Sequence, residues 1–379
     1  MKGISKEQII EDLQKLQRSL EKTHPNLYQY IPETDFSNEI TSLIDNYTNI
    51  SNLGLGIMQL LAQLKDGHTY LGLSDKVLGS KNFMFKFQFL NEGYYLTKSS
   101  QHLSQYLGSK LKGINNYNIK EIEKKLFSFI PQENEVSTKY YLSSKIVEPK
   151  ILEYLDIKTD DYITLHLELE QEAFSVQILP EDYNNEMISI ESKIPNIADT
   201  LSKKNVNWAK VIPEDEAFYL QYNKCEEDKD FDLRSLVDKF EQSEMSTFII
   251  DLRNNTGGDS DILEPLLNYL RKNDTRFKKI ILTGLDTYSS AIVNLLELSS
   301  LSNTISLGEI PHGNPTHYGE VKSFVLPNSR FQIFCSSKLF SSVGYDLGES
   351  FKPNYIISND MESLRKGIDK QIEYISQIE

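Results

Sequence analysis

Three short segments combine residue types that could support nucleophilic catalysis. The first, residues 251–259, reads DLRNNTGGD and follows an apolar run that predicts a buried strand over 247–252. Ligands bind at the carboxyl edge of such strands in open α/β sheets. Gly257 and Gly258 permit positive φ angles and leave backbone N–H groups uncovered, and such groups can hold an oxyanion. A tight turn without a ligand would favour the same glycines, so this segment alone leaves both interpretations open.

The second and third segments supply a hydroxyl and an imidazole. Ser289 lies in the run TYSSA, where a predicted strand turns into a helix, so its hydroxyl would be exposed at the sheet edge beside the N–H of Ser290. His68 lies in the loop sequence DGHT, residues 66–69, where it could act as a general base. Taken alone, the TYSSA segment favours a Thr or Ser helix cap and the DGHT segment favours a surface histidine.

The elements that must position these segments change character along the chain. Helical spacing of apolar residues predicts an N-terminal helix capped by Ser5 and Gln8. Alternating patterns over 83–89 and 163–178 predict half-buried strands. After about residue 205, continuous apolar strands alternate with helices, which indicates a parallel sheet buried on both faces.

We therefore expect an α/β protein, α+β overall, in three parts. These are a helical lead-in over 1–75 that ends in the DGHT loop, a β-rich lobe over 76–205 and an α/β core over 206–379. Hydrophobic residues make up 39% of the 379 residues, which is enough for a sizeable core.

Composition also excludes several classes of partner and site. The formal net charge of -15 disfavours nucleic acid and anionic membranes as partners. Cys225 and Cys335 lie far apart and outside any CxxC or Cys/His spacing, so we expect buried, reduced thiols and neither a disulfide framework nor a cysteine metal site. No apolar run reaches ~18 residues, so we expect no membrane span. The N-terminus lacks an apolar signal segment, which predicts a cytoplasmic protein, or an extracytoplasmic one if a leader has been removed.

Taken together, the motifs resemble those of the C-terminal processing peptidase family, also called tail-specific proteases, which includes the tricorn core. The resemblance is carried by IIDLRNNTGGD, TYSSA, LKDGHT, GEIPHG and LPNS, and by the helical opening, which is similar to that of members without a clear PDZ domain. It implies a crotonase/ClpP-like β-α superhelix as the catalytic core, with a smaller helical and β-rich lobe. It also implies a serine peptidase that acts on peptides or unfolded protein tails and needs no metal or cofactor.

The resemblance assigns roles position by position. Ser289 matches the nucleophile, while the N–H of Ser290 and that of Gly257 or Gly258 match the oxyanion donors. The best-known members carry a catalytic lysine just after a GE…G run, where this chain has Asn314. Asparagine cannot act as a base, so His68 is expected in that role, as in the tricorn-like branch.

The remaining assignments stay open. Glu349, or else Asp346, is expected to orient His68. Asp66, His312 and Asn314 are expected to contact the substrate, and His312 or His317 could replace His68 as the base. Two other functions fit parts of the pattern: an inactive ligand- or peptide-binding protein on the same fold, and an acyl-CoA enzyme, which would leave the corner serine unexplained. The oligomeric state is not predicted.

Overall fold

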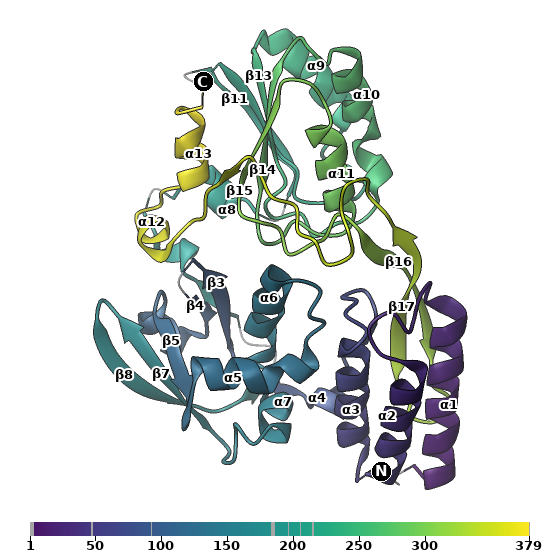
Figure 1. Ribbon diagram of the computed structural model, residues 1–379. Helices are drawn as coiled ribbons and strands as arrows, with labels where there is room; N and C mark the ends of the chain where they lie inside the picture. The colour runs from purple at the N-terminus through teal and green to yellow at the C-terminus, as the bar shows by residue number, and fades with distance from the viewer. Residues whose placement is uncertain are drawn as a thin grey trace. The chain divides into compact units, whose positions relative to one another are not determined.

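The computed structural model describes residues 4–46, 48–91, 93–182, 186–195, 197–204, 206–213 and 216–378 (Figure 1). The chain forms two compact units, Met1–Ile190 with Tyr318–Phe340, and Glu191–His317 with Ser341–Glu379. The segment 318–340, which the sequence assigns to the third part, therefore packs with the first unit. The division into three parts stays a prediction, and its boundary at residue 205 lies outside the described residues.

The second unit is built on a mostly parallel sheet. Its strand order is β11-β12-β13-β14-β15-β18, and β11 alone runs antiparallel to its neighbour. The bounds are β11 Trp208–Ile212, β12 Ala217–Gln221, β13 Thr247–Asp251, β14 Lys278–Thr283, β15 Thr304–Gly308 and β18 Tyr355–Ile356. The prediction of a buried parallel sheet after residue 205 is confirmed for the described part of this unit.

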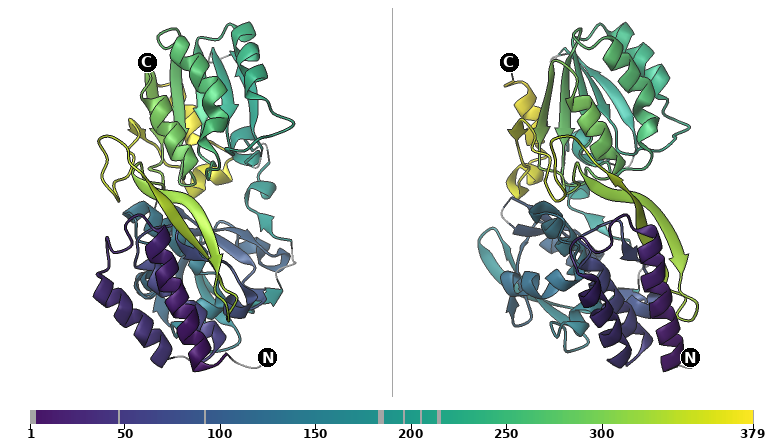
Figure 2. Two further views of the ribbon diagram at one scale, coloured as in Figure 1. Left: turned by 90° about the vertical axis from the view of Figure 1, so that its right-hand side faces the viewer. Right: turned by 45° about the vertical axis from the view of Figure 1, so that its right-hand side comes forward.

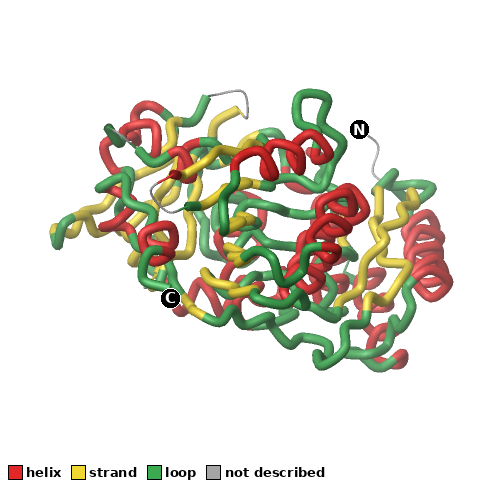
Figure 3. Tube along the Cα trace, turned by 90° about the horizontal axis from the view of Figure 1, so that it is seen from above, coloured by secondary structure: helices red, strands yellow, loops and turns green. Residues whose placement is uncertain are grey.

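Helices cover both faces of this sheet. On one face, Phe248, Ile250 and Ile281 pack against α9 (Leu233–Ser243), α10 (Glu264–Lys272) and α11 (Ser290–Ser299). On the other, Ile249 and Ile280 pack against α13 (Lys370–Ile375). Figures 1 and 3 show the helices flanking the strands of this unit. Shorter helical turns complete it: α8 Asp199–Ser202, η3 Glu191–Lys193, η5 Ser260–Leu263 and α12 Met361–Arg365.

The first unit begins with three helices, α1 Lys6–Thr23, α2 Glu33–Asp45 and α3 Ile50–Ala62. The capping box predicted at the start of α1 is confirmed, because Ser5 accepts the N–H of Gln8 and donates its own N–H to the Gln8 side chain. The buried face of α1 contains the predicted apolar residues Ile9, Leu13, Leu16 and Leu20.

A seven-stranded antiparallel sheet forms the β-rich part of this unit. Its order is β10-β4-β5-β7-β8, with β3 paired to β4 and β6 paired to β5. The bounds are β3 Phe85–Leu90, β4 Gly93–Ser99, β5 Lys110–Ile114, β6 Tyr117–Asn118, β7 Ile163–Leu169, β8 Glu172–Ile178 and β10 Ile188–Ser189. Strands β2 Lys81–Asn82 and β9 Glu181–Asp182 form a separate pair, and the helical elements are α4 Asp75–Leu78, η1 Gln101–Tyr106, α5 Ile119–Leu126, η2 Phe127–Phe129, α6 Glu135–Lys145 and α7 Pro149–Tyr154.

A small sheet anchors the loop that carries His68. Strand β1 (Tyr70–Leu71) follows this loop directly and pairs with β17 (Gln332–Phe340), which in turn pairs with β16 (His317–Val325). Asp12, buried on α1, accepts the N–H groups of Asn328 and Ser329 in the turn of this hairpin, at 2.8 and 2.7 Å. Figure 2 shows the hairpin running beside α1. Strand β17 pairs with β1 directly, and α1 binds the turn of the same hairpin, so together they fix β1 and the end of the His68 loop.

Cys225 and Cys335 are buried free thiols, as the sequence predicts. None of the helices that the structure describes is long and apolar enough to cross a membrane.

Candidate functional site

Ser289 occupies a strained corner between β14 and α11. Its φ and ψ angles are 52° and -123°, a region that residues other than glycine adopt at a cost of ~1–3 kcal/mol. Its side chain makes no capping hydrogen bond to the helix, so the interpretation as a simple helix cap does not hold. Strained corners of this kind present a serine hydroxyl at the edge of a sheet in known hydrolases.

Hydrogen bonds join this corner to the 251–259 loop. The hydroxyl of Thr287 donates to the carbonyl of Leu252 at 2.8 Å, and the N–H of Tyr288 donates to the carbonyl of Asn255 at 3.0 Å. The hydroxyl of Ser290 donates to the carbonyl of Gly258 at 2.6 Å. Parallel pairing of β13 with β14 brings the ends of both strands to one edge, so two of the three predicted segments meet there.

The two glycines differ in what their amides can do. Gly257 has a φ of 103°, and a Cβ there would lie 2.8 Å from the Ser289 Cβ and 3.1 Å from the Ser290 nitrogen, so this close approach requires glycine. Its N–H donates to Oδ1 of Asn255 at 2.9 Å. The N–H groups of Gly258 and Ser290 have no acceptor in the described part of the chain. Of the two predicted glycine donors, Gly258 is therefore the one with an available N–H.

A buried ionic network holds the start of this loop. Arg253 donates to both carboxylate oxygens of Asp251, with its Nε 3.0 Å from each, and to Asp369 at 2.8 Å. Tyr219 donates to Asp251 at 2.5 Å, and Thr200 donates to Asp369 at 2.6 Å. Burial raises the pKa of Asp369, but the charge and hydrogen bond of Arg253 outweigh this and keep it below its usual value. The sequence shows the DLR motif but not its partner Asp369, the N-cap residue of α13.

In the first unit, Asp66 organises the turn that carries His68. Asp66 is 1% exposed; its Oδ1 accepts the N–H of His68 at 2.9 Å and its Oδ2 accepts the hydroxyl of Thr69 at 2.5 Å. His24 accepts the N–H of Asn26 with Nδ1, so its Nε2 carries the proton and donates to Asp66 at 3.3 Å.

The charge of Asp66 acts directly on His68. Burial raises the pKa of Asp66, but the hydrogen bond from His24 and the proximity of His68 outweigh it, so the pKa lies below its usual value and Asp66 is ionised near neutral pH. Its Oδ1 lies 3.9 Å from Nδ1 of His68, which is too long for a hydrogen bond. The carboxylate of Asp66 is buried and both of its oxygens accept hydrogen bonds within its own unit, and a substrate contact by Asp66 stays a prediction.

The segment 308–314 packs against the Ser289 corner. The His312 ring, 3% exposed, stacks on the Tyr288 ring with centroids 4.4 Å apart, and its Nδ1–H donates to the carbonyl of Leu285. Burial lowers the pKa of His312 to about 4. Asn314 is also buried, and its carbonyl accepts Nδ1–H of His317 at 2.8 Å. Substrate contacts by His312 and Asn314 stay predictions.

Glu349 and Asp346 share one turn of the second unit. The N–H of Glu349 donates to the carbonyl of Asp346, and the N–H of Asp346 donates to Oε2 of Glu349, both at 3.2 Å. Both side chains are exposed. The turn holds Glu349 in a defined place, and its role beside His68 stays a prediction.

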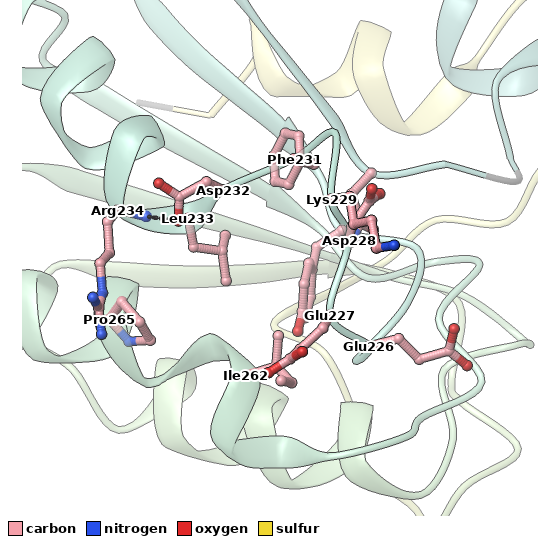
Figure 4. A pocket seen from close by; sticks show the side chains of 12 residues that line it. Glu226, Glu227, Asp228, Lys229, Phe231, Asp232, Leu233, Arg234, Ile262 and Pro265 are labelled. Atoms are coloured by element: carbon pink, nitrogen blue, oxygen red, sulfur yellow. Dashed lines mark hydrogen bonds between the residues drawn. The ribbon is translucent and has the colours of Figure 1, made fainter.

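A separate cavity of about 360 Å³ lies in the second unit (Figure 4). Its lining combines acidic side chains with apolar ones, among them Glu226, Asp228, Phe231 and Ile262, and it contains none of the predicted site residues. Among the residues that the structure describes, no cluster of three or more His, Cys, Asp or Glu side chains could hold a metal ion.

Comparison with known proteins gives one family and one fold. Residues 217–314 match the model of Peptidase family S41, a range that includes Gly257, Gly258, Ser289, His312 and Asn314. Among solved structures, mature CPAF complexed with lactacystin is similar with a TM-score of 0.69 and 12% identity, covering 98% of this chain and 97% of that one. Mature CPAF alone gives 0.67 and 12%, covering 98% and 96%. No curated protein sequence matches this chain. The family resemblance and the mixed α/β fold expected from the sequence are confirmed.

Proposed function

Since residues 217–314 match the model of peptidase family S41, a family of serine peptidases, we propose that Ser289 is the nucleophile of this chain and His68 its general base. The observation that carries the proposal is the strained corner of Ser289, whose hydroxyl does not cap its helix and whose backbone lies against Gly257. Strain of this kind persists where the surrounding structure enforces it, and it is common at catalytic sites.

The proposed reaction follows from these groups. His68 takes the proton of the Ser289 hydroxyl, whose oxygen attacks a peptide carbonyl. The N–H groups of Gly258 and Ser290 donate to the oxyanion of the tetrahedral intermediate, and His68 returns the proton to the leaving amine. Water, activated by the same imidazole, then hydrolyses the acyl-enzyme. Loss of one oxyanion donor lowers the rate by roughly 10²–10³-fold in other enzymes.

Two observations support our choice of His68 rather than His312 as the base. His312 belongs to the same unit as Ser289, but its pKa of about 4 gives it little tendency to take a proton at neutral pH. Asp66, by contrast, places a negative charge 3.9 Å from Nδ1 of His68, which stabilises the imidazolium that forms during the reaction. Glu349 remains the proposed third member that orients the ring.

The substrates are peptides or proteins, as the family implies. We propose that unfolded protein tails are preferred, on the resemblance to tail-specific proteases. The mechanism requires no metal or cofactor, because the proton transfers and the oxyanion are all served by groups of the chain.

Active-site labelling tests the proposal. A fluorophosphonate probe should label the wild-type chain and not Ser289→Ala, and unfolded casein should be cleaved by the wild type alone. Lactacystin, with which mature CPAF forms a complex, should reduce labelling if the two sites are alike. Equal labelling of Ser289→Ala would reject Ser289 as the nucleophile. A wild-type chain that binds peptides but is neither labelled nor active would favour the alternative, an inactive peptide-binding protein.

A further inference from the structure

Glu133 lies beside the turn that carries His68 and has no role in the mechanism above. It directly precedes Asn134, the N-cap of α6, and the backbone N–H of Gly67 and the charge of Asp66 both act on its carboxyl group. Its Oε2 atom is buried and has no hydrogen-bond partner among the residues that the structure describes. Buried polar atoms without a partner are rare in native proteins, and each calls for an explanation.

Two carboxyl groups thus flank Gly67, and they differ in charge. Burial and the charge of Asp66 raise the pKa of Glu133 to about 8, although the N–H of Gly67 partly opposes this. Asp66 is ionised, since its own pKa lies below the usual value. Near neutral pH the pair therefore carries one negative charge, on Asp66, and one proton, on Glu133.

We propose that Glu133 is a positioning residue for His68, and that its buried carboxyl group keeps the turn of Asp66, Gly67 and His68 in the form required for proton transfer. This inference rests on the proposed role of His68 as the base. Glu133 can affect His68 through Asp66, because Asp66 accepts the backbone N–H of His68 at 2.9 Å. A second negative charge on Glu133 would repel Asp66 and displace this hydrogen bond.

Other titratable groups face this pair from neighbouring elements. The charge of Glu133 raises the pKa of Tyr30, and the charge of Asp66 raises the pKa values of Tyr318 and Cys335. His24 donates a hydrogen bond to Asp66, and His68 interacts with its charge. Burial raises the pKa of Cys335 to about 12 and the pKa values of Tyr30 and Tyr318 above 10, so these three stay neutral near pH 8. The ammonium of Lys65 lies 5.2 Å from the centre of the Tyr30 ring and is the neighbouring cation.

The pH profile of peptide cleavage tests the proposal. In the wild type, we expect kcat/KM to fall above about pH 8 along a single ionisation, as Glu133 loses its proton. Glu133→Gln is neutral at every pH, so this alkaline fall should disappear. Glu135→Gln makes the same substitution two residues away, at an exposed side chain paired with Lys139, and should keep the wild-type fall.

A second variant separates positioning from folding. Glu133→Ala removes the carboxyl group altogether, and we expect kcat to fall by up to about 10²-fold with little change in KM, the loss that a misplacement of roughly 1 Å causes. Circular dichroism confirms that the variant is folded. Recovery of kcat in Glu133→Gln would show that the neutral polar group, rather than the packing volume, is what the turn needs.

The pH dependence of unfolding stability can be measured without enzyme activity. It therefore tests the role of Glu133 separately from the proposed peptidase function. The native chain holds a proton on Glu133 between pH 4.5, its value in the unfolded chain, and about 8. Unfolding stability of the wild type should therefore decline across that window relative to Glu133→Gln. A stability difference that is constant with pH, or an unchanged alkaline fall in Glu133→Gln, would overturn the inference. A wild type that is neither labelled at Ser289 nor active would instead overturn the proposed function.

Discussion

The hydroxyl of Ser290 donates to the carbonyl of Gly258 at 2.6 Å, so one hydrogen bond joins the two residues whose amides are proposed to hold the oxyanion. Each amide sits on a different element, one on the loop after β13 and one at the start of α11. The distance between the two amides depends on this bond and on the close approach of Gly257 to Ser289 and Ser290.

Ser290→Ala tests that dependence. We expect a loss of about 1 kcal/mol in stability, the usual contribution of one hydrogen bond, and a larger fractional loss in kcat than in 1/KM, because the oxyanion donors act in the transition state. Urea unfolding and steady-state kinetics measure the two effects. Ser300→Ala removes a hydroxyl that bonds within the other end of α11 and serves as the control. Equal effects in the two variants would mean that the Ser290 bond has no part in catalysis.

The identity of the base is tested by two alanine variants. His68→Ala should lower kcat/KM by roughly 10²–10⁴-fold, the usual contribution of a general base. His312→Ala should cost less in kcat, because a histidine with a pKa of about 4 is a weak base, although loss of its stacking on Tyr288 should lower stability. If His312→Ala abolished cleavage while His68→Ala retained it, the assignment would be reversed.

Arg253 is expected to be essential for the fold of the second unit. Arg253→Ala leaves the buried carboxylates of Asp251 and Asp369 without their cation, which costs about 3–5 kcal/mol. Arg253→Lys should recover part of this, since an ammonium supplies the charge but not the fork of donors.

Arg271→Ala is the matched control for Arg253. Its guanidinium pairs with Glu264 and Glu297 at the surface, so its loss should cost less than about 1 kcal/mol. Urea unfolding of the three variants decides between the two expectations. Similar losses in the free energy of unfolding for Arg253→Ala and Arg271→Ala would show that the buried Arg253 network stabilises the protein no more than a surface ion pair does.

Glu309 predicts a pH dependence of stability. Burial raises its pKa to about 7, whereas the unfolded value is 4.5. Between these values the native chain binds a proton that the unfolded chain has released, so stability declines as pH rises from 4.5 to about 7, by at most ~3 kcal/mol. Glu309→Gln should flatten this decline, and exposed Glu373→Gln should not. A slope that persists in Glu309→Gln would assign it to other groups.

Local patterns explain why much of the second unit could be predicted. Unbroken apolar runs identify β13 and β14 as buried strands, and the residues after them necessarily reach the same edge of a parallel sheet. This places Ser289 near the Gly257 loop before any coordinates are known. The choice between Gly257 and Gly258 could not be predicted, because it depends on where the Asn255 side chain points.

Long-range partners are what the sequence does not reveal. Arg253 and Asp369 are 116 positions apart, and Asp12 and Ser329 are 317 apart, so no periodicity links them. The hydrogen bond between His24 and Asp66 is another example, because these two residues are 42 positions apart.

The hairpin 318–340 also sets an order of events during synthesis. The first unit lacks the strands that pair with β1, and the turn that Asp12 binds, until the ribosome has passed residue 340. By then nearly all of the second unit's sheet has been translated. Contacts of such high sequence separation form slowly, so a nascent chain should expose the β1 edge for an extended time and rely on late docking of the hairpin to bring the His68 loop to its final form.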